Sequence, residues 1–381
     1  MTGPLAGVRV VELKGLGPAP FASMMLSDLG AEVIRVDRAS KVRGGNPAAP
    51  PAEVLLRGRR SVGIDLKNAD GVETLLRLID SADALIEGFR PGVCERLGIG
   101  PDVCLARNPA LVYGRMTGWG QEGPMAQRAG HDINYIALSG TLSMIGRKGQ
   151  APVPPVNLVG DFGGGGMLLA VGVLAGIVQA RSTGIGQVVD AAMVDGAALL
   201  ASMMYGMKAM GIWDGGRGAN LLDTGAHFYD IYETSDGEYI SLGGIEPQFY
   251  AEMLDRLGID ETTLGEQHDA SSWDASREVI ARRVAEKTQA EWDEIFDGSD
   301  ACYAPILDMD GARHHPHVAA RETFVEVAGV LQPAPAPRFS HTPTSTPTPP
   351  AHAGQHTDGV LADWGFSDDE IAALRDSGAV A

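Results

Sequence analysis

The stretch that decides the fold is residues 7–38, GVRVVELKGLGPAPFASMMLSDLGAEVIRVDR. Residues 8–13 are nearly all apolar, which is typical of a strand buried on both faces, and residues 31–37 have the same character. Between them, a Gly- and Pro-rich turn at 14–20 leads into a segment, 21–29, that favours a helix ended by Gly30. The pattern predicts a β-α-β unit.

Further strands are expected at residues 61–66, 84–89 and 111–117, with a helix over 70–79. Strands that alternate with helices predict an open, mostly parallel sheet, and therefore an α/β fold. Ligands bind such sheets beyond the C-terminal ends of the strands, so the polar residues that follow each strand are the first candidates for a binding site.

The Gly-rich turn also raises the possibility of a dinucleotide site. Pro20 stands where the third glycine of that fingerprint should be, and Pro18 removes a backbone N–H that a pyrophosphate would need. A nicotinamide or flavin enzyme is therefore a minor alternative. The simpler interpretation is a helix that starts with proline in its first turn.

A local concentration of positive charge lies between residues 35 and 67 of a chain whose net charge is −19. Two interpretations stay open: a site for a ligand with several phosphates, or a solvated face that is basic. The cations are Arg35, Arg38, Lys41, Arg43, Arg57, Arg59, Arg60 and Lys67.

The overall composition limits the classes of function. A hydrophobic fraction of 44% over 381 residues is enough for two domains with their own cores. The strong negative charge argues against nucleic-acid binding and against attachment to an anionic membrane. No apolar run long enough to cross a bilayer is expected, and the apolar segment 167–178 is interpreted as a buried helix interrupted by glycines.

The three cysteines, Cys94, Cys104 and Cys302, have neither metal-type spacing nor the pattern of a disulfide framework. Residues 1–7 show no basic or apolar region of a signal peptide. We therefore expect a cytoplasmic protein. The His-rich segment 313–317 is interrupted by Pro316, and we expect no metal site there.

The chemistry of the chain is expected between residues 130 and 166. GHDINY occupies 130–135 and NLVGDFGGGG occupies 157–166, so that His131 and Asp161 each lie next to glycine. An imidazole and a carboxylate in one excursion suit proton transfer to and from carbon. The glycines could let a substrate approach the backbone, and a helix after Asp161 could direct free N–H groups to the site. The alternative is a structural histidine and a helix-capping aspartate.

Later segments predict a second, smaller domain. Helices are expected over 162–181 and 191–210, then hairpin strands at 229–234 and 239–242, followed by helices of an α+β domain. Residues 312–324 are expected to be helical, and the Pro-rich segment 332–350 is expected to be an extended surface strap. The predicted division is a large domain at 1–200, a linker helix at 201–225, a small domain at 226–325 and a returning C-terminal part at 326–381.

Taken together, these segments resemble the α-methylacyl-CoA racemases, a branch of CoA-transferase family III, which is also called the formyl-CoA transferase family. The resemblance covers nearly the whole chain, and no single motif is decisive. It rests on PLAGVRVVEL (4–13), DLGAEVIRVDR (28–38), EGFRPGV (87–93), RMTGWGQEGP (115–124), GHDINY (130–135), NLVGDFGGG (157–165) and GIEPQFY (244–250).

The resemblance implies a large Rossmann-like domain with a parallel sheet, built from both chain ends, and a smaller central α+β domain. It also implies a homodimer of two interlocked subunits, with each active site between the large domain of one subunit and the small domain of the other.

The resemblance also implies the roles of particular residues. His131 and Asp161 would be the proton-transfer groups, and Glu246 from the partner subunit would support His131. No cofactor is implied beyond the CoA of the substrate. The residues expected to hold that CoA ester are Arg38, Ile64, Asp65, Leu66, Lys67, Gly88, Phe89, Arg90, Arg96, Gly130, His131, Asp132, Ile133, Asn134 and Tyr135.

The expected function is interconversion of (2R)- and (2S)-2-methylacyl-CoA thioesters through an enolate, in fatty-acid and lipid metabolism. A CoA-transferase that forms an acyl anhydride at Asp161 is the main alternative. A non-catalytic acyl-CoA-binding protein is the second. The pattern Gly-His-Asp at 130–132 favours the racemase. The sequence does not fix the preferred acyl chain.

Overall fold

The computed structural model describes residues 2–43 and 50–381. Residues 44–49, which belong to the basic stretch 35–67, lie outside the described residues. The chain divides into two compact units. Unit 1 contains residues 1–139, 156–200 and 317–381, and unit 2 contains residues 140–155 and 201–316. Residues 140–155 thus pack with unit 2, although we expected them in the large domain.

Unit 1 is built on a six-stranded parallel sheet in the order β3-β2-β1-β4-β5-β6. This order places the first strand near the middle, which creates the reversal of strand order at which α/β proteins bind ligands. The α/β class predicted from residues 7–38 is confirmed. The strands are β1 (Arg9–Leu13), β2 (Glu32–Arg38), β3 (Arg60–Ile64), β4 (Ala84–Glu87), β5 (Val112–Thr117) and β6 (Gln187–Ala192).

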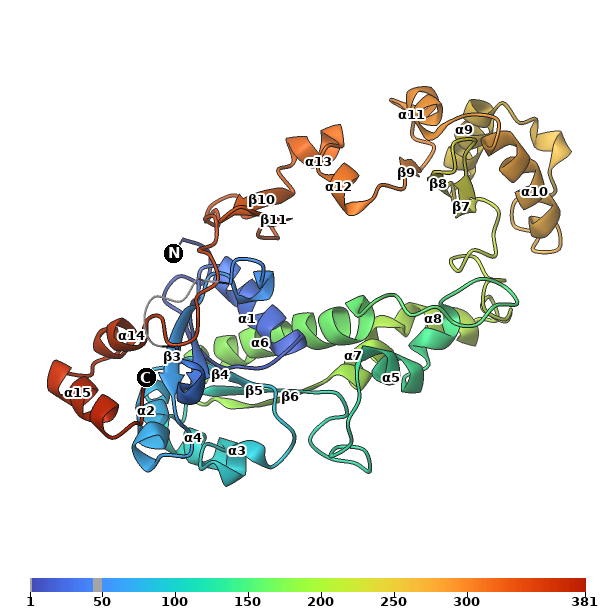
Figure 1. Ribbon diagram of the computed structural model, residues 1–381. Coiled ribbons are helices and arrows are strands. Elements are labelled where there is room, and N and C mark those ends of the chain that lie inside the picture. Colours follow the sequence, from blue (N-terminus) through green and yellow to red (C-terminus); the bar gives the residue numbers. More distant parts are fainter. Residues whose placement is uncertain (1, 44–49) are drawn as a thin grey trace. The chain divides into compact units, whose positions relative to one another are not determined.

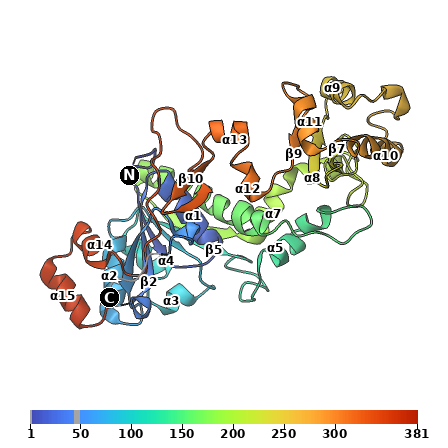
Figure 2. The same ribbon diagram turned by 45° about the horizontal axis from the view of Figure 1, so that its top comes forward.

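Helices cover both faces of this sheet (Figure 1). One apolar core joins the sheet to helices from both ends of the chain, α2 (Ala69–Ile79), α3 (Val93–Arg96), α4 (Pro101–Arg107), α14 (Thr357–Asp363) and α15 (Asp368–Asp376). Figure 2 shows the two C-terminal helices beside α2. The other core packs α1 (Pro18–Asp28), α5 (Asp132–Leu138), α6 (Leu168–Thr183) and α7 (Met193–Leu200) against the opposite face.

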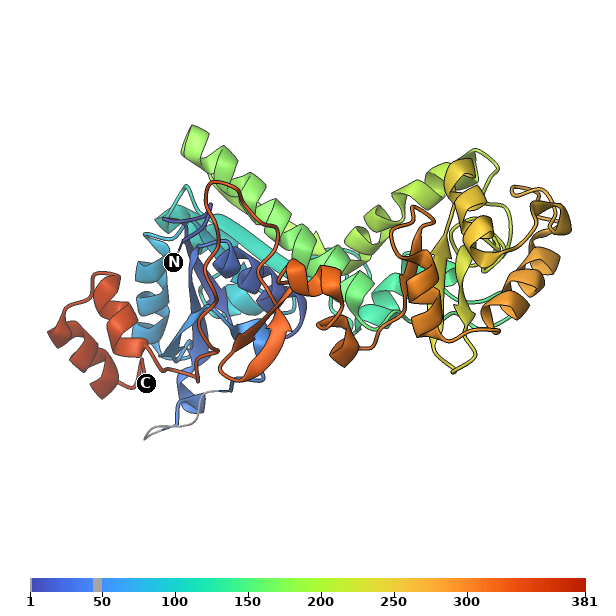
Figure 3. The same cartoon turned by 90° about the horizontal axis from the view of Figure 1, so that it is seen from above.

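Two expected helices differ from the structure. The helix predicted over 162–181 begins earlier, as the π-helix η4 (Leu158–Met167), and continues into α6. Figure 3 shows this long helix running across the sheet. The helix predicted over 191–210 is divided, because residues 187–192 complete the sheet as β6 and α7 is separated from α8 (Ser202–Ala209) at Ala201.

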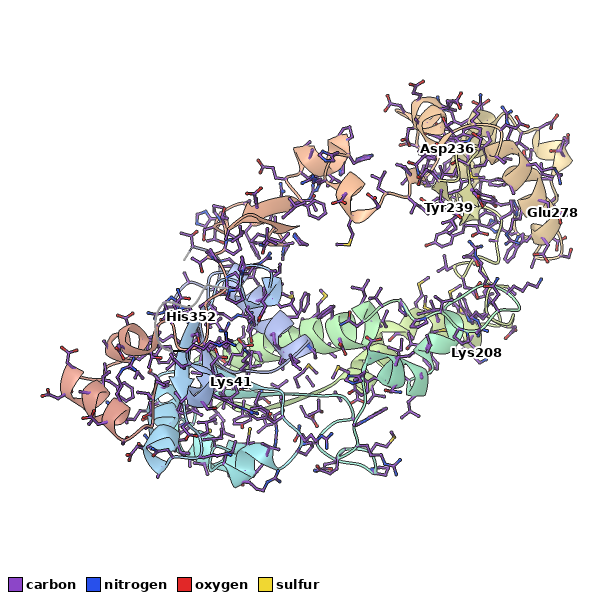
Figure 4. The ribbon with its side chains drawn as sticks, in the orientation of Figure 1. Lys41, Lys208, Asp236, Tyr239, Glu278 and His352 are labelled. Atoms are coloured by element: carbon purple, nitrogen blue, oxygen red, sulfur yellow. The ribbon has the colours of Figure 1, made fainter. Side chains whose placement is uncertain are left out.

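Unit 2 contains a three-stranded antiparallel sheet of β7 (Tyr229–Glu233), β8 (Tyr239–Gly243) and β9 (Tyr303–Pro305). Asp236 lies in the β7–β8 turn and Tyr239 begins β8, and both are labelled in Figure 4. An aromatic core around Phe228 and Trp292 joins this sheet to α9 (Pro247–Leu257), α10 (Trp273–Val284) and α11 (Gln289–Phe296).

The predicted helix over 312–324 is wrong in its extent, because Pro316 separates α12 (Met309–Ala312) from α13 (Pro316–Ala320) and β10 (Phe324–Val327) follows. That strand pairs with β11 (Val330–Pro333). The remaining elements are the 3₁₀ turns η1 (Ala39–Lys41), η2 (Val54–Leu56), η3 (Thr141–Met144) and η5 (Glu261–Thr263).

Candidate active site

The predicted CoA-binding positions follow neighbouring strands of the sheet in unit 1. Arg38 ends β2, Ile64 ends β3, and residues 65–67 form the turn that follows. Residues 88–90 come directly after β4, and Arg96 ends the short helix beyond them. Because all six strands are parallel, these positions share the C-terminal edge of the sheet, where open α/β sheets bind ligands.

The side chains at these positions are not equally available. Ile64 is 1% exposed and forms a bridge with Val380, so its side chain belongs to the core. Leu66 and Phe89 also pack against that core. The exposed members of the set are Arg38, Lys67, Gly88, Arg90 and Arg96.

His131 stands at the head of α5, in the excursion that follows β5. Its backbone N–H donates to the Asn134 side-chain oxygen at 3.0 Å, which fixes the start of the helix. The Tyr135 hydroxyl donates back to the carbonyl of Gly130, and its ring packs edge-on against Trp119. The His131 side chain itself is exposed. The backbone of this loop is thus fixed by Asn134 and Tyr135, while the residue His131 stays exposed.

Asp161 lies in the first turn of the π-helix η4 and is partly buried. Its Oδ2 accepts a hydrogen bond from the Asn157 side-chain amide at 3.1 Å. A Cβ added to Gly17 would lie 3.5 Å from the same oxygen, so the β1–α1 turn borders this carboxyl group. The β1–α1 turn and the first turn of η4, which are distant in the sequence, therefore meet at Asp161.

The buried carboxylate of Asp132 connects the two arms. Its Oδ2 accepts the backbone N–H of Gly160 at 2.6 Å and that of Asp161 at 2.8 Å. Asp132 is 4% exposed, and it follows His131 directly in the chain. The segment with the imidazole and the helix turn with the carboxylate are thereby fixed to each other across 29 residues.

The surroundings of Asp161 shift its pKa upward. Burial raises the pKa of Asp161 above its ordinary value, and the charge of Asp132 raises it further. The Asn157 hydrogen bond and the positive charge that His131 can carry oppose this pKa shift. Burial and the same two carboxylates raise the pKa of Tyr135 to about 12, so Tyr135 is neutral. His131, Asp132, Tyr135 and Asp161 thus influence one another.

The glycines after Asp161 were expected to let a substrate approach the backbone, but in the structure they let helices pack closely. A Cβ on Gly164 would lie 2.6 Å from the backbone nitrogen of Ala197, and one on Gly166 would lie 2.7 Å from the carbonyl oxygen of Pro18. These glycines let the π-helix pack against the backbones of α7 and α1, not against a substrate. The N–H groups of Gly160 and Asp161 are also not free for a ligand, because Asp132 accepts both.

The basic stretch 35–67 needs a similar correction. Arg59 pairs with Glu12 at 3.0 Å with both side chains fully buried, and Arg57 pairs with Asp28. Arg35 pairs with Asp37 at 2.7 Å, and Arg60 pairs with Glu32. Neither earlier interpretation applies to these four arginines, because they form ion pairs within unit 1. Arg35 and Arg57 also bind the strap, at Ala351 and Gln332 respectively.

Two cations of the stretch, Lys41 and Arg43, are exposed and line a hollow of ≈ 240 Å³. Lys14, Arg35 and His352 also line it, with Glu53 as an opposing charge. Lys41 and His352 are labelled in Figure 4. An anion could bind at this surface, whereas Arg57 and Arg59, which are buried and pair with Asp28 and Glu12, are removed from the list of candidate phosphate ligands.

Glu246 belongs to unit 2, where it precedes α9, and its side chain is exposed. Burial of the Cys302 thiol raises its pKa, and the negative charge of Glu246 raises it further. The two side chains therefore lie near each other. The amide of Gln267 donates to the carbonyls of Gly244 and Ile245 and so supports the turn before Glu246.

The apolar surface of the long helix overturns one expectation. Residues 158–183 form a continuous helical run of 26 residues that contains an 18-residue window of mean hydropathy 1.7, so by length and composition alone it could cross a membrane. The glycines in this run do not interrupt the helix, whereas the sequence was interpreted as a helix interrupted by glycines. Its inner face packs in the core of unit 1, while Met167, Val171 and Val178 are 49–71% exposed along one stripe.

Sequence reasoning missed the side-chain role of Asp132 and the contributions of Gly17 and Asn157. Asp132 was expected only among the CoA-binding residues. Two sequence features could have pointed to them. Asn157, Gly160 and Asp161 stand at helical spacing, and Asp132 directly follows His131. Nothing local in the sequence says that the Asp132 carboxylate accepts N–H groups of another helix.

Comparisons with known proteins show that this chain belongs to CoA-transferase family III. The profile described as CoA-transferase family III matches residues 5–357. The chain is 46% identical to alpha-methylacyl-CoA racemase of Mus musculus and 43% identical to that of Homo sapiens, in each case over 97% of this chain and 96% of the relative. The crystal structure of a CaiB/BaiF family protein from Brucella suis matches with a TM-score of 0.78 and 25% identity, over 96% of this chain and 100% of that one.

Proposed function

Because this chain belongs to CoA-transferase family III, and because its similarity to two racemases extends over nearly its full length, we propose that it interconverts (2R)- and (2S)-2-methylacyl-CoA thioesters. The observation that carries this proposal is the pair His131 and Asp161, held on two arms that Asp132 joins at the ligand-binding edge of a parallel sheet.

The proposed reaction uses the two side chains in turn. In one direction, neutral His131 takes the α-proton and protonated Asp161 gives a proton to the opposite face of the enolate. The products are the inverted thioester, a protonated imidazole and an ionised carboxylate, which is the form ready for the opposite enantiomer. The raised pKa of Asp161 supports this scheme, because the carboxyl group must carry a proton in one of the two forms.

The enolate oxygen needs hydrogen-bond donors. Asn134 and Tyr135 donate their backbone N–H groups to the carbonyl of His131. The N–H groups of Asp132 and Ile133 precede them at the start of α5 and have no acceptor inside the helix. They are the donors that we propose for the thioester oxygen.

The CoA portion is proposed to lie along the strand ends, with Arg38, Lys67, Arg90 and Arg96 as partners for its phosphates. These four side chains are exposed and follow β2, β3 and β4. Guanidinium groups and ammonium groups are the usual ligands of phosphates in proteins. Ile64, Leu66 and Phe89 would contribute mainly through their backbone, because their side chains are wholly or partly in the core.

We further propose that the protein is an interlocked homodimer and that Glu246 of one subunit supports His131 of the other. The support is the exposed apolar stripe on α6 together with Leu199 and Leu200 of α7, which are 58% and 53% exposed. Large apolar side chains that stay exposed on helices of one core are typical of an interface. A second copy of this chain is the proposed cover, and we expect no membrane insertion.

Co-expression of two inactive chains tests the shared site. One chain carries His131→Ala and the other carries Glu246→Gln. If Glu246 acts across the interface, the mixed dimer has one site with both native residues and regains activity. If Glu246 acts within its own chain, both sites of the mixed dimer stay impaired, and the interlocked arrangement of the site is excluded.

The transferase alternative is not retained, because the two racemases are 46% and 43% identical to this chain over 97% of its length, whereas human succinyl-CoA:glutarate CoA-transferase is 28% identical. The deciding experiment is incubation with one 2-methylacyl-CoA ester in D₂O without any acceptor acid. Deuterium entering the α-position, followed by NMR, is expected of the racemase. Absence of exchange with intact CoA binding would instead select a non-catalytic binding protein.

We also propose a cytoplasmic location and a role in fatty-acid and lipid metabolism. The location is supported by Cys94 and Cys104, which are unpaired and buried, with the pKa of each thiol raised to about 12 by burial. Such thiols are protonated and unreactive, as in proteins of a reducing compartment. Cell fractionation checks the location.

A further inference from the structure

The carboxylate of Asp132 binds the backbone of the helix turn that carries Asp161. The two hydrogen bonds, 2.6 Å to the N–H of Gly160 and 2.8 Å to that of Asp161, are both short. They join positions that are 28 and 29 residues apart in the chain. Asp132 thus caps the start of another helix, and not that of its own helix α5.

The surroundings are adapted to this contact. A Cβ on Gly160 would lie 2.6 Å from Asp132 Oδ2, so no larger residue fits at position 160 while the contact exists. The second oxygen, Oδ1, is also buried and has no hydrogen-bond partner among the described residues. A buried carboxylate with an unpaired oxygen is a costly way to cap a helix, which argues for a purpose beyond stability.

We propose that Asp132 is a positioning residue of the racemase, whose carboxylate fixes the Asp161 backbone and thereby places the Asp161 side chain opposite His131. This inference rests on the proposed function, because it assumes that His131 and Asp161 exchange protons with the substrate. The Asp132 carboxylate acts through Asp161, whereas the Asp132 backbone N–H is the donor proposed above for the thioester oxygen.

The same carboxylate has an electrostatic effect on Asp161. Its charge adds to burial in raising the pKa of Asp161, whereas His131 and the Asn157 amide lower it. Tyr135 of α5 faces the same group and stays neutral. Other charged residues on the elements packed against the π-helix do not contribute to this pKa shift; they are Asp28, Arg115, Arg181, Asp190 and Asp195.

The test compares Asp132→Asn with Asp132→Ala. An asparagine oxygen can still accept both N–H groups, so the turn stays in place while the charge is lost. We expect a loss in kcat of about tenfold for Asp132→Asn and of more than about a hundredfold for Asp132→Ala, since misplacement of a catalytic group by 1 Å can cost about a hundredfold. The KM for the CoA ester should change little in either variant.

The pH profile separates positioning from simple stabilisation. Loss of the negative charge lowers the pKa of Asp161. The limb of the rate profile that belongs to Asp161 should therefore move to lower pH in Asp132→Asn, in both directions of the reaction. If the Asp161 limb of the pH profile is unchanged in Asp132→Asn, the proposal is overturned. This holds whether the variant has native activity or loses activity only because its melting temperature falls. If Asp132→Ala does not fold, the asparagine variant alone decides.

A matched control lies at the opposite edge of the sheet. Asp83 Oδ2 accepts the backbone N–H of Arg9 at 2.8 Å, which is the same kind of contact away from the site. Asp83→Asn should lower the melting temperature without moving the pH profile. Failure of the proposed function is read separately, from Asp161→Ala, because full activity in that variant removes the reaction on which this inference depends.

Discussion

The two arms of the candidate site differ in how they hold their side chains. His131 is exposed at the end of a loop, and its neighbours Asn134 and Tyr135 stabilise the backbone around it. Asp161 is partly buried on a helix that packs against two other helices through glycines. Water can reach the imidazole more easily than the carboxyl group. We therefore call Asp161 the fixed arm, because packing holds it in place, and His131 the adaptable arm, because it is exposed to solvent.

The largest expected effect is that of Asp161→Ala. A partly buried carboxyl group cannot be replaced by bulk water, so we expect a loss of about 10⁴-fold in racemisation, at the upper end of the range for general acid–base groups. The measurement is α-deuterium exchange by NMR, with CoA-ester affinity as the control. Native exchange rates in this variant would contradict the assignment of Asp161.

A smaller loss is expected for His131→Ala. Because the imidazole is exposed, water or added imidazole can substitute for it, and we expect a loss of about 10²-fold, the lower end of the same range. Partial recovery with exogenous imidazole is the diagnostic measurement. If both alanine variants lose the same activity and neither is rescued, the distinction between a fixed and an adaptable arm is wrong.

The packing of the fixed arm can be broken without touching a catalytic group. A Cβ at Gly164 meets the backbone of α7 at 2.6 Å, so Gly164→Ala should destabilise the protein by about 1–3 kcal/mol and lower kcat. Gly359 of α14 is the control, because a Cβ there meets nothing within 4 Å. Gly359→Ala should stabilise by about 0.5–1 kcal/mol. Denaturant unfolding measures both, and equal effects would refute the packing argument.

The smallest expected effect concerns stability and pH. The pKa of Asp161 is raised in the folded protein, so ionisation of this group disfavours folding as pH rises. The neutral isostere Asp161→Asn should therefore melt at a slightly higher temperature than the native protein at pH 7. The difference should shrink as the pH falls and the native carboxyl group becomes protonated. A lower melting temperature for the variant at pH 7 would show that Asp161 is not under electrostatic strain.

Much of the fold could be predicted from the sequence. The β-α-β unit, the parallel sheet and several helix limits follow from local periodicity and turn chemistry; the helix expected over 70–79 is α2, which spans Ala69–Ile79. The errors occur where tertiary contacts override local pattern. Residues 191–192 join the sheet as part of β6, although the methionines that follow favour a helix.

The candidate site was predictable in its members but not in its connections. His131, Asp161 and the strand-end positions could be found because each lies beside glycine or at the end of a predicted strand. The partner of Asp132 could not, because the hydrogen bond to Asp161 spans 29 residues and depends on how two helices pack.

By itself, the sequence determined the family, the parallel sheet and the two groups proposed for proton transfer, since these depend on short-range pattern and residue type. The tertiary structure alone decided which cations are available to a ligand. Arg38 and Arg59 look equivalent in the sequence, yet one is exposed at a strand end and the other is fully buried against Glu12, 47 residues away. The physical reason is that a buried charge needs a partner of opposite charge, which can be distant in the sequence. No local sequence pattern shows which arginine becomes buried on folding.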